Sequence, residues 1–357
     1  MQLFSPTNLG ALALSNRVVM APLTRMRAGA DGVPNDLLVE HYRQRATIGL
    51  IITEGTYTSP VSRSYPGQPG IVAAEQVAGW RRVTDAVHDE GGAIVMQLMH
   101  GGRVTHSDIN GGLTPVAPSA IAIDGEARTP LGKKPFPVPH ALTEKEVAGI
   151  VAELARTARS AIEAGFDGVE VHSANGYLLH EFLSPVSNTR TDSYGGSPEN
   201  RARLGIEAVT AIASEVGADR VGIRISPSHN IQDVIESDPD VTRATYDALI
   251  TGIAPLGLAY LSVLHHDPAG ELVQDLRARF DGPLMANSGF GLLTTRDEAV
   301  DFVQNGAAEV VAVGRPVIAN PDLVRRWRDG HPLNEPNPRT FYGRGAEGYT
   351  DYPALAG

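Results

Sequence analysis

In the segment 167–177, an apolar run is followed by three polar side chains that could do chemistry. His172, Asn175 and Tyr177 follow closely on a segment whose composition predicts a strand. Imidazole and carboxamide groups donate hydrogen bonds, and a phenol with an ordinary pKa near ~10 keeps its proton at neutral pH. The three groups together could hold a substrate oxygen and deliver a proton. Taken singly, each would be explained as well by packing or by a turn.

The elements around these residues predict a barrel that would bring polar groups together. Short apolar runs alternate with longer segments of helical period, as expected when parallel strands are joined by crossover helices. Eight such units close a single (β/α)8 TIM barrel, whose active sites lie at the C-terminal ends of the strands. The predicted strands are 17–21, 49–54, 93–98, 168–172, 221–226, 259–264, 283–286 and 309–313.

Helical signals separate these strands. Apolar residues recur at helical spacing over 147–158, and a further helix is predicted over 74–88. Ser197 before Pro198 is typical of an N-cap followed by the first helical residue. Residues 294–298 predict the start of the helix before the last strand.

The chain of 357 residues is longer than the ~250 of a bare barrel. Most of the excess lies in residues 99–143, which are rich in proline and glycine and predict a lid or hairpin over the site. The segment 332–357 is expected to wrap the barrel. With no linker or repeat in the sequence, we expect one domain over 1–357.

Composition excludes several classes of function. The chain has no cysteine, which rules out disulfides, thiolate metal sites, cysteine nucleophiles and iron–sulfur clusters. Its formal net charge of −11 disfavours nucleic acid and anionic membranes as partners. The start of the sequence lacks the pattern of a signal peptide, and no segment is apolar enough to span a membrane. We therefore expect a cytoplasmic protein, monomeric or homodimeric, with a small-molecule substrate.

The last two predicted strands end in groups suited to a phosphate. Gly289 and Gly291 follow the seventh strand, and Gly314 and Arg315 follow the eighth, where such barrels often bind phosphate. Glycines let backbone amides approach an anion, and arginine offers a bidentate fork. An isolated Gly-Arg pair would more simply be a tight turn, but its place on the barrel favours an anion site. The groups at Thr24, Gly55, Gln97 and Arg224 could then surround a flat heterocycle.

At this point several motifs resemble a known family, the old yellow enzymes, which are FMN-dependent ene-reductases related to N-ethylmaleimide reductase. The most specific is the run from His172 through Ser184-Pro185 to Asn200-Arg201. The resemblance extends over nearly the whole chain, in the segments 20–25, 97–103, 314–316 and 345–353.

The resemblance implies roles for individual residues. The flavin ring and ribityl chain would contact Pro22, Thr24, Gly55, Gln97 and Arg224, and the phosphate would be held by Gly289, Gly291, Gly314 and Arg315. His172 and Asn175 would bind the carbonyl oxygen of an activated alkene, and Tyr177 would be the proton donor. The substrate side would be lined by Tyr65, Met99, Gln232 and Tyr342.

The implied activity is NAD(P)H-dependent reduction of C=C bonds in enones, quinones and maleimides, together with the reduction of nitro compounds. FMN would be bound non-covalently, NADPH or NADH would be the reductant, and turnover would be ping-pong. Thr24 stands where one subgroup has cysteine, and Met99 stands where relatives often carry tryptophan. The flexible methionine side chain predicts a roomier wall.

Other functions remain open from the residues alone. A metal-dependent barrel hydrolase could use His100, His172 and either His265 or His266. His265, His266 and Asp267 form a poor metal cluster, however, because adjacent strand residues face opposite ways. A non-catalytic flavin-binding or scaffold protein is a third possibility. A Schiff-base aldolase is disfavoured, because the lysines at 133, 134 and 145 lie at no strand end. We expect no metal, and we expect Glu170 to brace an arginine inside the barrel rather than to act with Glu54 as an acid/base pair.

Overall fold

Within residues 1–356, the part of the chain that the computed structural model describes, the centre is a closed barrel of eight parallel strands. Each strand pairs with the next, and the last pairs with the first. In order around the barrel they are β3 (Val18–Met20), β4 (Leu50–Ile52), β6 (Ile94–Met99), β11 (Gly168–Ser173), β12 (Val221–Ile225), β13 (Tyr260–Leu264), β14 (Leu284–Asn287) and β15 (Val310–Val313). The predicted (β/α)8 TIM barrel and the positions of its strands are confirmed.

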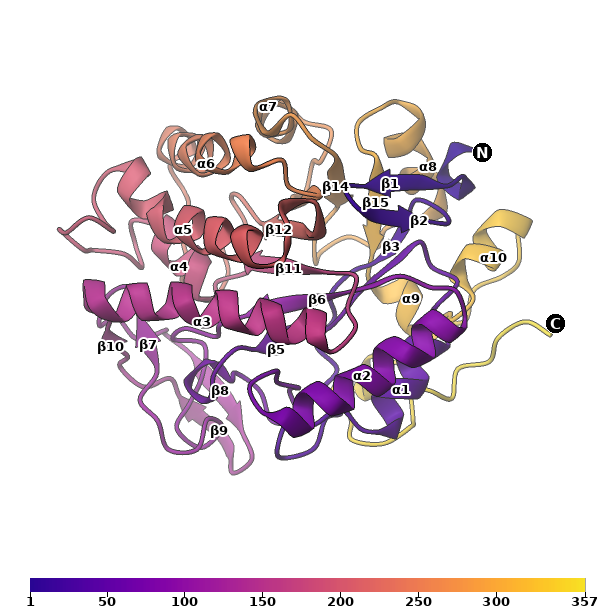
Figure 1. The fold of residues 1–357 in the computed structure, drawn as a ribbon, viewed down its shortest axis with the longest axis horizontal. Helices are drawn as coiled ribbons and strands as arrows, with labels where there is room; N and C mark the ends of the chain where they lie inside the picture. Colours follow the sequence, from indigo (N-terminus) through magenta and orange to yellow (C-terminus); the bar gives the residue numbers. More distant parts are fainter. Residues whose placement is uncertain (357) are drawn as a thin grey trace.

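Helices connect the strands and cover the outside of the barrel (Figure 1). The connecting helices are α1 (Asp36–Arg43), α2 (Ala74–Asp89), α3 (Glu144–Glu163), α5 (Pro198–Val216), α6 (Pro239–Ile253), α7 (Glu271–Phe280), α8 (Arg296–Gln304) and, after the last strand, α10 (Leu323–Asp329). The short helices α4 (Leu178–Leu183) and α9 (Arg315–Ala319) follow the ends of β11 and β15. Short 3₁₀ turns occupy Gln2–Phe4, Pro60–Ser62, Ala218–Arg220, Ala254–Leu256 and Pro338–Thr340.

Alternation along the strands decides which side chains enter the barrel. On β11, Val169 and Val171 join the large cluster that packs against the helices. Successive strand residues point to opposite faces, so Glu170 and His172 point inward. The strand reads as apolar because its outward face is apolar, while its inward positions carry the polar groups of the site.

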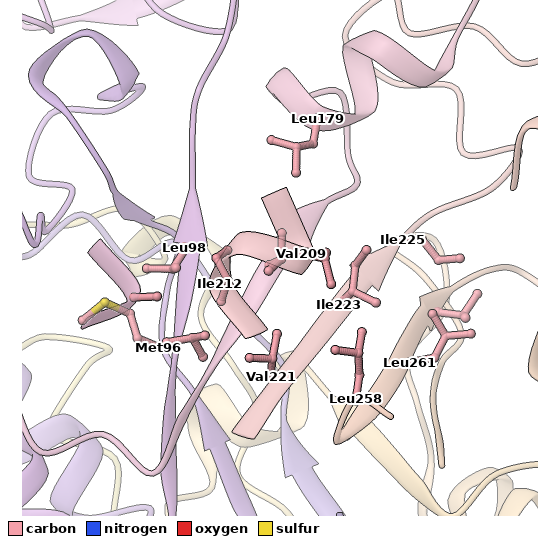
Figure 2. Close-up of a cluster of buried hydrophobic side chains, with 14 of the residues drawn as sticks. Met96, Leu98, Leu179, Val209, Ile212, Val221, Ile223, Ile225, Leu258 and Leu261 are labelled. Atoms are coloured by element: carbon pink, nitrogen blue, oxygen red, sulfur yellow. The ribbon is translucent and has the colours of Figure 1, made fainter. Parts of the chain in front are cut away.

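The outer face of the barrel forms the main hydrophobic core. Figure 2 shows Val209 and Ile212 of α5 beside Leu98 of β6 and Ile223 of β12. The start of α5 agrees with the prediction, because the Ser197 hydroxyl accepts a hydrogen bond from the Asn200 amide at 3.3 Å. The helix is therefore held both by its cap and by burial of its apolar stripe.

A hairpin that the sequence analysis did not predict covers the N-terminal end of the barrel. It consists of β1 (Thr7–Leu9) and β2 (Leu12–Leu14), and the amide of Ala11 in its turn donates to the carbonyl of Asp219 at 2.8 Å. Leucines of both strands pack with inward barrel residues such as Val95 and Met285. This end is filled by apolar side chains, which leaves the opposite end for a site.

The insertion after β6 forms the predicted excursion. Its strands β8 (Glu126–Thr129) and β9 (Gly132–Pro135) make an antiparallel hairpin, which extends beyond the barrel in Figure 1. At its base, β7 (Val116–Ala117) pairs in parallel with β10 (His140–Ala141). A further short strand, β5 (Thr56–Tyr57), pairs with the end of β6.

The C-terminal segment wraps against the loop that follows β3, as predicted. Tyr349 is fully buried, with its ring stacked on His41 at 3.9 Å between centroids. The guanidinium carbons of Arg25 and Arg27 lie 5.0 and 4.5 Å from the centre of the same ring. This cluster anchors the segment that brings Tyr342 to the mouth of the barrel. In the part of the chain described, no helix is both long enough and apolar enough to cross a membrane.

Candidate active site

A cavity of about 570 Å³ lies at the C-terminal ends of the barrel strands. Its volume is in the range of pockets that bind small organic ligands. Most of the residues predicted for the site line it, namely Pro22, Thr24, Gly55, Tyr65, Gln97, Met99, His172, Asn175, Tyr177, Gln232, Arg315 and Tyr342. Residues that are far apart in the sequence meet here because parallel strands end at the same edge of the barrel.

His172 is a buried, neutral hydrogen-bonding group at the end of β11. Burial, and then the positive charge of Arg224, hold its pKa well below the ordinary value of histidine. Its Nδ1 atom is buried and has no hydrogen-bond partner among the described residues. A neutral imidazole with a free ring nitrogen can bind a polar ligand atom in the cavity.

Asn175 lies in the turn that follows β11, with a left-handed φ of 57°. Its amide donates to the Ser226 hydroxyl at 2.9 Å, and its carbonyl accepts from the Gln232 side chain at 2.9 Å. Asparagine adopts this backbone conformation more readily than most residues. The backbone is thus engaged on both sides, while the buried Oδ1 atom has no partner among residues 1–356.

Tyr177 and Tyr65 form a pair of phenols on the wall of the cavity. Their hydroxyl oxygens are 2.7 Å apart, and the ring of Tyr177 lies 5.1 Å from that of His172. Burial raises the pKa of Tyr177 well above the ordinary value and also raises that of Tyr65. Both phenols therefore carry their protons at neutral pH.

A polar layer lies deeper in the barrel. The Gln97 amide donates to a Glu170 oxygen at 2.8 Å, and Arg224 donates to Ser262 and Asn287 at 3.0 and 3.1 Å. The expectation that Glu170 braces an arginine therefore needs correction, because its hydrogen-bond partner is Gln97. Arg224 acts on Glu170 through its charge, which opposes the rise in the pKa of Glu170 caused by burial.

The residues predicted to bind the phosphate lie next to one end of the cavity. Arg315 reaches its wall, and the guanidinium donates to the carbonyl of Phe290 in the loop after β14. Gly289 in that loop has a left-handed φ of 95°, and Gly314 directly precedes α9. Gly289, Gly291, Gly314 and Arg224 do not themselves form the cavity wall.

Several lining residues were not predicted for the site. They are Leu23, Arg25, Met26, Arg128, Ile231, Phe290, Ile318 and Phe341. Most of these residues are next to a predicted site residue in the sequence, so they could have been predicted from that position alone. Arg128 is different, because it comes from the β8–β9 hairpin and reaches the cavity only through the folding of the excursion.

The expectation that His265 and His266 face opposite ways was wrong. The two residues lie beyond the end of β13, and their ring centroids are 4.2 Å apart, so they do not face opposite ways. The His265 Nδ1 atom lies 2.9 Å from the Asp267 carbonyl oxygen. Within the described part of the chain, no group of three or more His, Asp or Glu residues is arranged to hold a metal ion.

Comparison with known proteins places this geometry in context. Residues 2–334 match the model of the NADH:flavin oxidoreductase / NADH oxidase family. A probable flavin mononucleotide-dependent alkene reductase of Leishmania infantum is 44% identical, over 99% of this chain and 97% of the relative. Among solved structures, an old yellow enzyme homologue from Zymomonas mobilis is 38% identical with a TM-score of 0.94, covering 99% of this chain and all of that one. Morphinone reductase in complex with tetrahydroNAD is 43% identical with a TM-score of 0.93, covering 100% and 98%.

Proposed function

The chain belongs to the NADH:flavin oxidoreductase / NADH oxidase family, as a member of the old yellow enzymes, and we propose that its cavity binds FMN and reduces activated C=C bonds with NADPH or NADH. The substrates are enones, quinones and maleimides. The observation that carries this proposal is the convergence of His172, Asn175 and Tyr177 on one wall of the cavity.

The polar groups of the cavity fit a flavin. Buried polar atoms normally have partners, yet Nε of Arg224 has none among the described residues. Thr24, Gly55, Gln97 and Arg224 would hold the ring system and ribityl chain, beside Pro22. Arg315 with Gly289, Gly291 and Gly314 would hold the phosphate. Bound FMN would supply two-electron chemistry, the transfer of hydride from NAD(P)H to the β-carbon of the alkene.

His172 and Asn175 stabilise the charge that develops on the substrate. Addition of hydride to an enone places negative charge on the carbonyl oxygen, so donors held ready at that oxygen lower the barrier. One such donor is typically worth about 3 kcal/mol, roughly 100-fold to 1000-fold in rate. Since the pKa of His172 is lowered, the imidazole acts as a neutral donor rather than as a cation.

Tyr177 completes the reaction by giving a proton to the α-carbon. Its raised pKa keeps the phenol protonated over the whole physiological range. Tyr65, Met99, Gln232 and Tyr342 line the space for the substrate. Product formation thus adds one hydride and one proton across the double bond, and the electrons come from NAD(P)H.

A spectroscopic titration tests the proposed function. The purified protein should show the absorption bands of oxidised flavin, lose them on anaerobic addition of NADPH, and regain them on addition of 2-cyclohexenone. A colourless protein, or a flavin that NADPH does not bleach, would contradict the enzyme and favour a scaffold or a mere flavin-binding protein. Activity lost after dialysis against a chelator would instead favour the metal-dependent hydrolase.

The proposal also includes the domain organisation, the location, the oligomeric state and the partners of the enzyme. One FMN-binding domain over residues 1–357, a cytoplasmic location and a monomeric or homodimeric state are part of the proposal. The net charge of −11 argues against nucleic acid as a partner.

A further inference from the structure

One peptide group at the site is held from both sides. It joins Asn175 to Gly176, so its carbonyl oxygen belongs to the first residue and its N–H to the second. The carbonyl accepts from the Gln232 side chain at 2.9 Å, and the N–H donates to His180 Nδ1 at 2.9 Å. This peptide lies between the Asn175 side chain and Tyr177, and therefore sets the direction of both.

The backbone at this peptide needs such support. Asn175 and Gly176 have left-handed φ angles of 57° and 83°. A residue other than glycine is uncommon in this region and persists where the surrounding structure holds it, whereas Gly176 adopts it freely. Gln232, the partner on the carbonyl side, itself has a φ of 56°. The two loops thus hold each other in place.

The hydrogen bond from Gly176 also fixes the tautomer of His180. Nδ1 accepts an N–H and therefore carries no proton, so the proton of the neutral ring is on Nε2. Nε2 lies 3.3 Å from an oxygen of Glu236, and the side chains of His180 and Glu236 are 0% and 3% exposed. Because the Glu236 carboxylate accepts from Nε2–H, Nδ1 is left without a proton and can accept from the Gly176 N–H.

Glu236 is held in turn by the loop after β12. Its second oxygen accepts from the Ser228 amide at 2.8 Å and from the Tyr246 hydroxyl at 3.4 Å. Its own amide donates to the Asn230 side chain at 2.7 Å. A continuous chain of hydrogen bonds therefore runs from this loop through His180 to the peptide before the catalytic phenol.

We propose that His180, oriented by Glu236, is a positioning residue whose Nδ1 atom holds the Asn175–Gly176 peptide so that the Asn175 carboxamide and the Tyr177 phenol face the substrate. The inference rests on the proposed function and extends it to a residue that does not line the cavity. It assigns the effect to one atom, the ring nitrogen that accepts from Gly176.

Two substitutions distinguish the role of this atom from the role of the rest of the side chain. In His180→Asn, the amide oxygen lies near the position of Nδ1 and can still accept from Gly176. In His180→Gln, the amide lies one bond further out, reaches toward Glu236 and leaves no acceptor at the position of Nδ1. The control is His88→Gln, which removes a solvent-exposed pair, with Nε2 at 3.1 Å from Asp167, and neither residue lines the cavity.

We expect His180→Gln to keep its FMN and to lose about tenfold to a hundredfold in kcat for 2-cyclohexenone, because a small misplacement of reacting groups has effects of this size. His180→Asn should stay within about threefold of the wild type, as should His88→Gln. Equal losses in the Asn and Gln variants, or none in either, would overturn the assignment. A wild-type protein without flavin or without enone turnover would contradict the proposed function instead.

A second measurement covers the case in which the Gln variant does not fold. The imidazole ¹⁵N chemical shifts of His180 in the wild-type holoenzyme report which nitrogen carries the proton. We expect a bare Nδ1 and a protonated Nε2 at pH 7. A proton on Nδ1 would refute the proposed role of His180 as acceptor from Gly176, whatever the variants do.

Discussion

The hydroxyl oxygens of Tyr65 and Tyr177 are 2.7 Å apart at the wall of the cavity, although 112 positions separate the two residues in the chain. A hydroxyl donates one hydrogen bond, so one phenol donates to the other, and the second phenol can direct its own hydrogen at another acceptor. Donation from Tyr65 to Tyr177 would direct the Tyr177 proton at the substrate. Either hydroxyl can be the donor, and the proposed role of Tyr177 requires the arrangement in which Tyr65 donates.

The first prediction concerns Tyr177→Phe, which removes the proposed proton donor and keeps the ring. We expect reduction of 2-cyclohexenone to fall by roughly 100-fold to 10,000-fold, the usual contribution of a positioned general acid. Reduction of a quinone should fall much less, because its new protons end on oxygen and exchange with water. Steady-state rates with both substrates check this.

Tyr65→Phe is the matched control for that prediction. It removes the neighbouring hydroxyl and leaves the Tyr177 proton in place, so the loss with 2-cyclohexenone should be below about tenfold. Equal losses for enone and quinone in Tyr177→Phe would argue against a role in protonation.

The second prediction concerns the pair of donors. His172→Ala and Asn175→Ala should each slow enone reduction by roughly 100-fold to 1000-fold, and the double variant should be almost inactive. FMN should remain bound, because other residues hold most of the flavin. Flavin content by absorbance and turnover of 2-cyclohexenone are the measurements, and unchanged turnover in the double variant would refute the assignment.

The third prediction tests the phosphate end. Arg315→Gln removes a charged donor and should weaken FMN binding by roughly 10-fold to 100-fold, as expected for a hydrogen bond between charged groups. Riboflavin lacks the phosphate, so its Kd should not change. Fluorescence titration of the deflavinated protein with both ligands measures the two constants, and an equal effect on both would place the phosphate elsewhere.

The fourth prediction is a pH dependence of stability. Glu181 is fully buried in α4, and burial raises its pKa from 4.5 to about 8 although Arg103 acts in the opposite direction. The folded protein keeps a proton that the unfolded chain releases. The contribution of Glu181 to the free energy of unfolding is therefore fully present below pH 4.5. It falls as the pH rises from 4.5 through 8, by up to about 4 to 5 kcal/mol in total.

Glu181→Gln should remove this loss, because glutamine is a neutral isostere that can still accept from the Arg103 amide, a bond of 2.8 Å in the wild type. The free energy of unfolding in urea at pH 5 and pH 9 gives the difference for wild type and variant. The exposed Asp89→Asn serves as control and should leave the wild-type slope unchanged. A slope in Glu181→Gln as steep as in the wild type would show that other groups cause it.

The local sequence was sufficient for the barrel strands, the main crossover helices and most of the cavity wall. Apolar runs and capping residues such as Ser197 act over a few positions, so their effect can be read without the fold. The hairpin β1–β2 escaped prediction because its strands are only three residues each and gain their burial from the barrel end that they cover.

Sequence by itself determined the class of fold, the absence of thiol chemistry and the set of polar groups at the strand ends, because these follow from residue type and from the rule that parallel strands share one edge. Only the tertiary structure decided which of those groups touch. The pairing of Gln97 with Glu170 depends on the register between β6 and β11. The contact of the Tyr65 and Tyr177 hydroxyls and the reach of Arg128 from its hairpin depend on loops that are distant in the chain. The conformations of such loops are set by packing against the rest of the molecule, and no local pattern encodes them.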